Sequence, residues 1–150
     1  MKKMALLIPC VIICLTGCMR FGLSSGPAAQ VQAAEDLFKA KKYDEALGAY
    51  RKVLAASPAP SLEDAADARF GLAYTTAFYD NPQRNYAQAL QEFDEFLKQY
   101  PHNARSREAQ NWRYVLRIIV DVRKENEHLS KSIEQLKKLD IRHEERRGGK

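Results

Sequence analysis

Two short stretches, Tyr43-Asp44-Glu45-Ala46-Leu47 and Tyr86-Ala87-Gln88-Ala89-Leu90, indicate how this chain folds, because they carry one pattern twice. They lie 43 residues apart, from Tyr43 to Tyr86. The same offset pairs further residues of matching class: Tyr50 with Phe93, Leu54 with Leu97 and Pro58 with Pro101. A fixed offset of this kind is the signature of an internal repeat. We therefore expect two copies of one structural unit.

The residues around these stretches predict helices. From about Val31 onward Ala, Leu, Glu, Lys, Arg and Gln dominate, and the alternation of polar and apolar residues that marks a strand is absent. Pro58 and Pro101 follow the two copies, and proline ends a helix because it lacks a backbone donor and clashes with the preceding turn. The sequence predicts an all-α fold of helical hairpins, followed by a long helix from Ser106 to about Glu145.

The pattern inside each copy resembles the tetratricopeptide repeat. That family places Gly or Ala before Tyr or Leu in its first helix, then a small residue, an aromatic residue and a proline in its second. The matching residues are Ala34, Leu37, Ala46, Tyr50 and Pro58 in the first copy, and Gly71, Tyr74, Ala89, Phe93 and Pro101 in the second. The resemblance implies a tetratricopeptide-like domain over residues 31–122, with about two units and a capping helix. The longer interval from Gly71 to Ala89 is similar to the units of the outer-membrane barrel-assembly lipoprotein family.

The N-terminal segment has the features of an export signal. Lys2 and Lys3 precede an apolar run from Met4 to Leu15, and the run ends in Leu15-Thr16-Gly17-Cys18. A charged start, a short apolar segment and a small residue before the cut are typical of such signals. The apolar run is shorter than the ~20 residues that a membrane span needs.

The last four of these residues resemble the lipobox of bacterial lipoproteins, whose cysteine is acylated and becomes the first residue of the mature chain. The resemblance implies that residues 1–17 are a signal peptide and that Cys18 carries a membrane anchor. A plain secretory signal, cleaved without a lipid, is the alternative. In Gram-negative sorting an Asp after the cysteine retains a lipoprotein in the inner membrane. Met19 stands there instead, so the resemblance points to the outer membrane, facing the periplasm. Residues 18–30 are predicted to be a flexible tether.

The composition argues against several classes of function. Cys10 and Cys14 would leave with the signal and Cys18 would carry lipid, so the sequence predicts no disulfide, no thiol nucleophile and no cysteine metal site. The formal net charge of +5 includes Lys2 and Lys3, which would also leave, so the mature chain is too weakly basic for a nucleic-acid-binding domain.

The chain also lacks a pattern of residues suited to catalysis. Its histidines, His102, His128 and His143, have no second ligand at metal-binding spacing, and there is no Gly-rich phosphate loop. The sequence therefore predicts a protein that is not an enzyme and that has no cofactor and no metal site.

On the tetratricopeptide pattern, a partner would bind in a groove lined by the first helix of each unit. Carried over to this chain, the groove residues are Glu35, Phe38, Lys39, Leu72, Thr75 and Thr76. Phe38 would be an apolar anchor with charges beside it, or else a core residue.

The long C-terminal helix carries a second pattern. Apolar residues recur at alternating steps of three and four, which is typical of a coiled-coil seam. The seam consists of Trp112, Val115, Ile119, Val122, Asn126, Leu129, Ile133 and Leu136, of which Asn126 is the one polar member. Up to Val122 this face is expected to cap the second unit, since a terminal repeat must be covered. Residues 123–150 are expected to form a charged helix. Its part from Asn126 to Leu136 is expected to form a coiled coil, either as a weak homodimer or with a partner helix.

Taken together, these features predict a lipid-anchored adaptor or scaffold of the cell envelope that binds a protein partner through helical repeats. Two alternatives have the same architecture: an accessory lipoprotein that regulates a sensor kinase, and one that serves a secretion or pilus machine.

Overall fold

The computed structural model describes residues 26–148, and this part of the chain is all-helical, with no strand. Its helices are α1 (Pro27–Lys39), α2 (Tyr43–Leu54), α3 (Leu62–Ala77), α4 (Tyr86–Gln99) and α5 (Ser106–Gly148). The predicted all-α fold with a long C-terminal helix is thereby confirmed. The signal segment 1–17, Cys18 and most of the tether lie outside the described residues.

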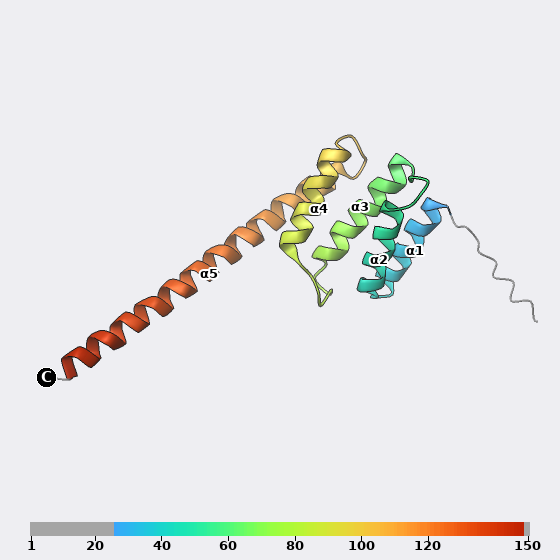
Figure 1. Ribbon diagram of the computed structural model, residues 1–150. Coiled ribbons are helices and arrows are strands. Elements are labelled where there is room, and N and C mark those ends of the chain that lie inside the picture. The colour runs from blue at the N-terminus through green and yellow to red at the C-terminus, as the bar shows by residue number, and fades with distance from the viewer. Residues whose placement is uncertain (1–25, 149–150) are drawn as a thin grey trace, which may run out of the picture.

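Neighbouring helices run in alternating directions, and each packs against the next (Figure 1). We call α1 with α2 the first hairpin and α3 with α4 the second hairpin. The two hairpins meet where α3 packs against both α1 and α2. The start of α5 covers α4, and the rest of α5 continues away from the other helices (Figure 1).

The first helix begins earlier than predicted. α1 starts at Pro27, so the last residues of the predicted tether, 27–30, are helical. Proline suits this position because the first residues of a helix have no intrahelical partner for their N–H groups, and the fixed φ of proline matches the helix. Glycine and proline therefore mark a helix start here rather than continued flexibility.

Polar side chains cap the two helices of the second hairpin. The Ser61 hydroxyl accepts a hydrogen bond from the backbone N–H of Asp64 at 3.1 Å, at the start of α3. The Asn85 side chain accepts one from the backbone N–H of Gln88 at 3.0 Å, at the start of α4. Each cap satisfies a donor that the first turn leaves free.

Two clusters of buried side chains form the core, one on each side of α3. The first joins α3 to α1 and α2 and contains Val31, Ala34, Ala46, Leu47, Tyr50, Val53, Ala68 and Leu72. The second joins α3 to α4 and α5 and contains Ala66, Phe70, Ala73, Ala77, Ala89, Phe93, Phe96, Ala109 and Leu116. Ala46 and Ala89, the small residues of the repeat, are both fully buried. α3 is thus covered on two faces.

The contact between the hairpins depends on Gly71. A Cβ atom added to this residue would overlap the ring of Tyr50, which belongs to the first hairpin. Tyr50 is itself buried. Glycine at this position therefore allows α3 to approach α2 across the aromatic ring.

The loop from Phe78 to Asn85 lies within the longer interval from Gly71 to Ala89, and it is folded around one buried residue. The Asn81 side chain donates a hydrogen bond to the carbonyl of Thr75 and accepts one from the backbone N–H of Gln83, both at 2.9 Å. Asn81 is fully buried, and a buried amide is stable only when it is bonded in this way.

The same loop is bonded to the first hairpin. The Asp80 carboxylate lies 2.7 Å from the Lys41 ammonium and accepts a hydrogen bond from the Tyr43 hydroxyl at 3.1 Å. The Gln83 amide donates to the Asp44 carboxylate at 2.9 Å. These bonds connect the loops at one end of the two hairpins.

The start of α5 packs on the second hairpin, in agreement with the predicted capping role, but the residues that do so differ in part from the seam. Ala109 and Leu116 are buried and Trp112 is half-buried, whereas Val115 and Val122 are exposed. The Trp112 ring stacks on Phe93 with a centroid distance of 6.3 Å. The capping face is therefore rotated about the helix relative to the seam.

Candidate functional site

A pocket of about 210 Å³ lies where α1, α3 and the start of α5 meet. We call it the α1–α3–α5 pocket. It is lined by Glu35, Phe38, Lys39, Tyr50, Phe70, Gly71, Tyr74, Thr75, Arg105 and Glu108. The lining combines aromatic side chains with acidic and basic ones, and it comes from both hairpins and from the start of the capping helix.

Aromatic rings make up the apolar part of the pocket. Phe70 and Tyr74 are stacked on α3, with ring centroids 6.4 Å apart. The centre of the Tyr74 ring lies 5.5 Å from that of Phe38 on α1 and 5.4 Å from that of Trp112 on α5. Aromatic pairs at such distances add stability beyond the area that they bury. Tyr74 thus connects the three helices that surround the pocket.

Arg105, in the loop before α5, forms the charged wall. Its guanidinium lies 3.2 Å from the Asp67 carboxylate on α3 and 4.0 Å from the Glu35 carboxylate on α1. It also lies 4.8 Å from the centre of the Phe70 ring, within the range of a cation–π contact. Arg105 therefore holds α1, α3 and the α4–α5 loop together beside the pocket.

The two tyrosines of the pocket are held in their neutral form. Burial raises the pKa of Tyr50 far above its usual value, and the nearby Glu35 carboxylate adds to the effect. Burial also raises the pKa of Tyr74, with a smaller contribution from Glu108. Neither phenol ionises at neutral pH, so both remain available as hydroxyl groups.

The structure brings four of the six predicted groove residues together. Glu35, Phe38, Lys39 and Thr75 line the α1–α3–α5 pocket. Thr75 belongs to its buried floor, because it is 1% exposed and its hydroxyl donates to the carbonyl of Gly71 at 2.7 Å. Phe38 also packs against the rings of Tyr43, Tyr74 and Phe78, so it contributes to the fold as well as to the pocket.

The other two predicted groove residues lie in the interior. Leu72 is 4% exposed and belongs to the core cluster of the first hairpin. Thr76 is 3% exposed, and its hydroxyl donates to the carbonyl of Leu72 at 2.8 Å. A partner could not reach either side chain, because α3 is rotated so that these positions face inward.

Sequence reasoning missed Phe70, Arg105 and Glu108, and it named Tyr50, Gly71 and Tyr74 only as positions of the repeat pattern. Nothing in the spacing of the sequence distinguishes Arg105 from other surface arginines, because its partners lie on two distant helices. The signal that existed was the pairing of Tyr50 with Gly71, which locates the junction between the hairpins.

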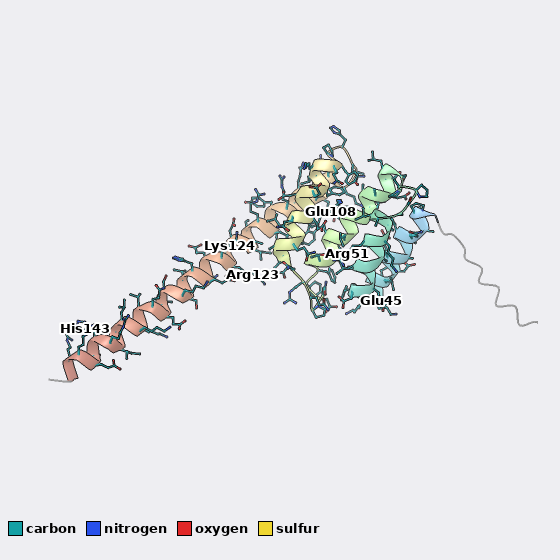
Figure 2. The ribbon with its side chains drawn as sticks, in the orientation of Figure 1. Glu45, Arg51, Glu108, Arg123, Lys124 and His143 are labelled. Carbon is teal, nitrogen blue, oxygen red and sulfur yellow. The ribbon has the colours of Figure 1, made fainter. Side chains whose placement is uncertain are left out.

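The predicted seam residues lie along α5. Ile119 is half-buried, while Val122, Asn126, Leu129, Ile133 and Leu136 are exposed. The Asn126 side chain donates to the carbonyl of Val122 at 3.0 Å. Figure 2 shows Arg123 and Lys124 where α5 leaves the other helices, and His143 near its far end.

The histidines of the chain are dispersed. His102, His128 and His143 are all exposed. Among residues 26–148, no group of three His, Cys, Asp or Glu side chains is placed to hold a metal ion. Within the same range, no helix has the length and apolar character needed to cross a membrane.

The α1–α3–α5 pocket joins residues of both hairpins and of the start of α5 around one space. Comparison of the chain with protein-family models, with curated proteins and with solved structures finds no match.

Proposed function

We propose that this chain is a lipid-anchored adaptor of the bacterial cell envelope that binds a protein partner in the α1–α3–α5 pocket. In this proposal the two hairpins are tetratricopeptide-like units and the start of α5 caps them. The α1–α3–α5 pocket carries the proposal, because it combines an apolar aromatic surface with charges of both signs.

The size of the pocket favours a protein segment over a small molecule. Sites for small molecules usually enclose roughly 300–1,000 Å³. The α1–α3–α5 pocket is smaller, at about 210 Å³, and has room for one large side chain. An apolar side chain on a peptide would pack against Phe70 and Tyr74, while its neighbours along the peptide would meet the charged rim.

The rim indicates the charges that such a segment would carry. Lys39 on α1 and Glu108 on α5 are both exposed, and they flank the pocket from opposite helices. Arg105 is already paired with Glu35 and Asp67, whereas Lys39 has a solvent-exposed ion pair at 3.5 Å with Asp36 of its own helix. The expected ligand is therefore a segment with one large apolar residue between an acidic and a basic residue.

Charge reversal on the rim tests this proposal. The variant Lys39→Glu with Glu108→Lys exchanges the two rim charges without altering the aromatic floor. With the full chain as bait in envelope extracts, we expect the partner captured by wild type to be recovered at least tenfold less well by the variant. Thermal unfolding should remain close to that of wild type, because both side chains are exposed.

The matched control is Arg51→Glu, an exposed position on α2 outside the pocket (Figure 2). It should leave capture unchanged. If rim reversal does not weaken capture, or if the control weakens it equally, the α1–α3–α5 pocket is not the binding site.

A further inference from the structure

One face of α5 presents apolar side chains to solvent over most of its length. Leu129, Ile133 and Leu136 are 51%, 53% and 64% exposed, and Val115 and Val122 are about half exposed. With Ile119 and Asn126 they occupy the a and d positions of three successive heptads. The a positions are Ile119, Asn126 and Ile133, and the d positions are Val115, Val122, Leu129 and Leu136. We call this set the seam.

The seam borders the face with which α5 packs on the second hairpin. That capping face contains Ala109, Trp112 and Leu116. Trp112 lies seven residues before Ile119, so the two faces overlap at the start of α5, where Ile119 is half-buried. From Val122 to Leu136 the seam is exposed while α5 is docked on α4, and a second helix could lie along this part without displacing α4.

We propose that the seam binds the seam of a second copy of this chain, with the two helices parallel and in register. β-Branched residues at a, together with leucine at d, favour a parallel two-stranded coiled coil. Here Ile119 and Ile133 occupy a positions, and Leu129 and Leu136 occupy d positions. This pattern points to a dimer.

Asn126 selects the parallel orientation. In a parallel pair in register, residues at a face the same residue of the other copy, so Asn126 would meet Asn126 of the second copy and the two amides could bond to each other. In an antiparallel pair, a positions face d positions, and Asn126 would be placed against valine or leucine. A buried amide without a partner is strongly unfavourable. A single Asn at an a position is known to set register in this way.

The flanking charges allow the same arrangement. In a parallel pair in register, Glu125 would lie opposite Ser130 of the second copy, and Ser132 opposite Lys137. Neither pair brings like charges together, which would oppose association. Asp140 occupies the next a position and would face its own copy, so the paired region ends after Leu136.

The pairing is expected to be weak. Half-exposed side chains of this number would bury on the order of 500 Å² of apolar surface between two copies. Stable interfaces usually bury roughly 1,200–2,000 Å² in total. The test must therefore trap a transient pair and not depend on a dimer that survives dilution.

Disulfide trapping measures the proximity of matching positions. In the full chain with Cys10, Cys14 and Cys18 changed to Ser, Leu136→Cys introduces one thiol on the seam and Gln135→Cys introduces one on another face of α5. Both positions are exposed. With detergent micelles in excess over protein, we expect Leu136→Cys to form a disulfide-linked dimer at least ten times faster than Gln135→Cys. Equal rates would overturn the proposal. An antiparallel pair would give this result, because it would hold the two thiols introduced by Leu136→Cys far apart.

A second comparison tests whether the seam itself causes the proximity. Adding Leu129→Asp and Ile133→Asp to the Leu136→Cys chain should reduce the rate to that of Gln135→Cys. Adding His128→Asp and Gln135→Asp instead places two acidic residues at exposed positions off the seam and should leave the rate high. If the seam charges do not slow disulfide formation, the contact does not run along the seam and the proposal is wrong.

Discussion

At the scale of single residues, Gly71 and Tyr50 explain how two hairpins of similar sequence join. The repeat places an aromatic residue in α2 and a residue without a side chain in α3, and the structure packs one directly against the other. The ring fills the space that any Cβ would occupy. Tyr50 and Gly71 therefore act together to fill the junction between the hairpins, because protein interiors are packed as densely as crystals.

Gly71 and Gly48, both in helices, provide a matched test of this role. A Cβ at Gly71 would overlap Tyr50, whereas a Cβ at Gly48 would meet nothing within 4 Å. We expect Gly71→Ala to lower the free energy of unfolding by about 1–3 kcal/mol through overpacking. Gly48→Ala should raise it by about 0.5–1 kcal/mol, because alanine loses less backbone entropy in a helix. Urea unfolding of both variants measures this. Similar effects at the two positions would contradict the close approach of the hairpins.

At the scale of elements, the bonds between the two loops hold one end of the hairpins together. Lys41 and Tyr43 both bond to Asp80, and these two bonds lower the pKa of the Asp80 carboxyl below its ordinary value of 3.8. The folded chain therefore binds this proton less readily than the unfolded chain does. It follows that the bonds stabilise the fold above about pH 4 and that this contribution is lost as the pH falls through the lowered pKa.

Asp80→Asn tests this contribution. At pH 7 the variant should unfold at a lower temperature than wild type, because it loses the charge that binds Lys41. The difference should shrink as the pH falls through the lowered pKa of Asp80, because the wild-type carboxyl then becomes protonated as well. Asp121→Asn, at an exposed position on α5, serves as the control and should show no such convergence. A difference that is constant with pH would mean that the Asp80 charge is not responsible.

The elements could be predicted from the sequence because their signals are local. Residues of the same class recur at the offset that separates Tyr43 from Tyr86, because both units pack their helices in the same way. Prolines mark the ends of the units. Leu72 and Thr76 were misplaced because the rotation of α3 about its axis depends on two neighbouring helices at once. Arg105 was missed for the same reason, since its carboxylate partners belong to α1 and α3.

At the scale of the whole molecule, only a short segment of sequence separates the proposed anchor at Cys18 from the first hairpin. α1 begins at Pro27, nine residues after Cys18. If Cys18 carries lipid, the first hairpin is held close to the membrane and α5 extends from the opposite side of the folded part (Figure 1). Durable attachment needs more than one acyl chain.

The anchor can be tested with two cysteines of the N-terminal segment. Cys18→Ala should accumulate as an uncleaved precursor and lose incorporation of a labelled fatty-acid analogue. Cys14→Ala, four residues earlier in the apolar run, should be processed and labelled like wild type. Labelling that persists in Cys18→Ala would refute acylation at this residue. That result would not bear on binding in the α1–α3–α5 pocket, since the pocket does not depend on the anchor.

The position of the far end of α5 depends on the angle at which the helix docks on the second hairpin. From Lys124 to Gly148 the helix extends for roughly 37 Å at 1.5 Å per residue. A tilt of about ten degrees where it leaves α4 would therefore displace its tip by roughly 6 Å. Trp112 packs on Tyr74 and Phe93 in the docked part of α5 and so helps to fix this angle. A small change in this packing would therefore displace the tip of α5 far more than the docked part.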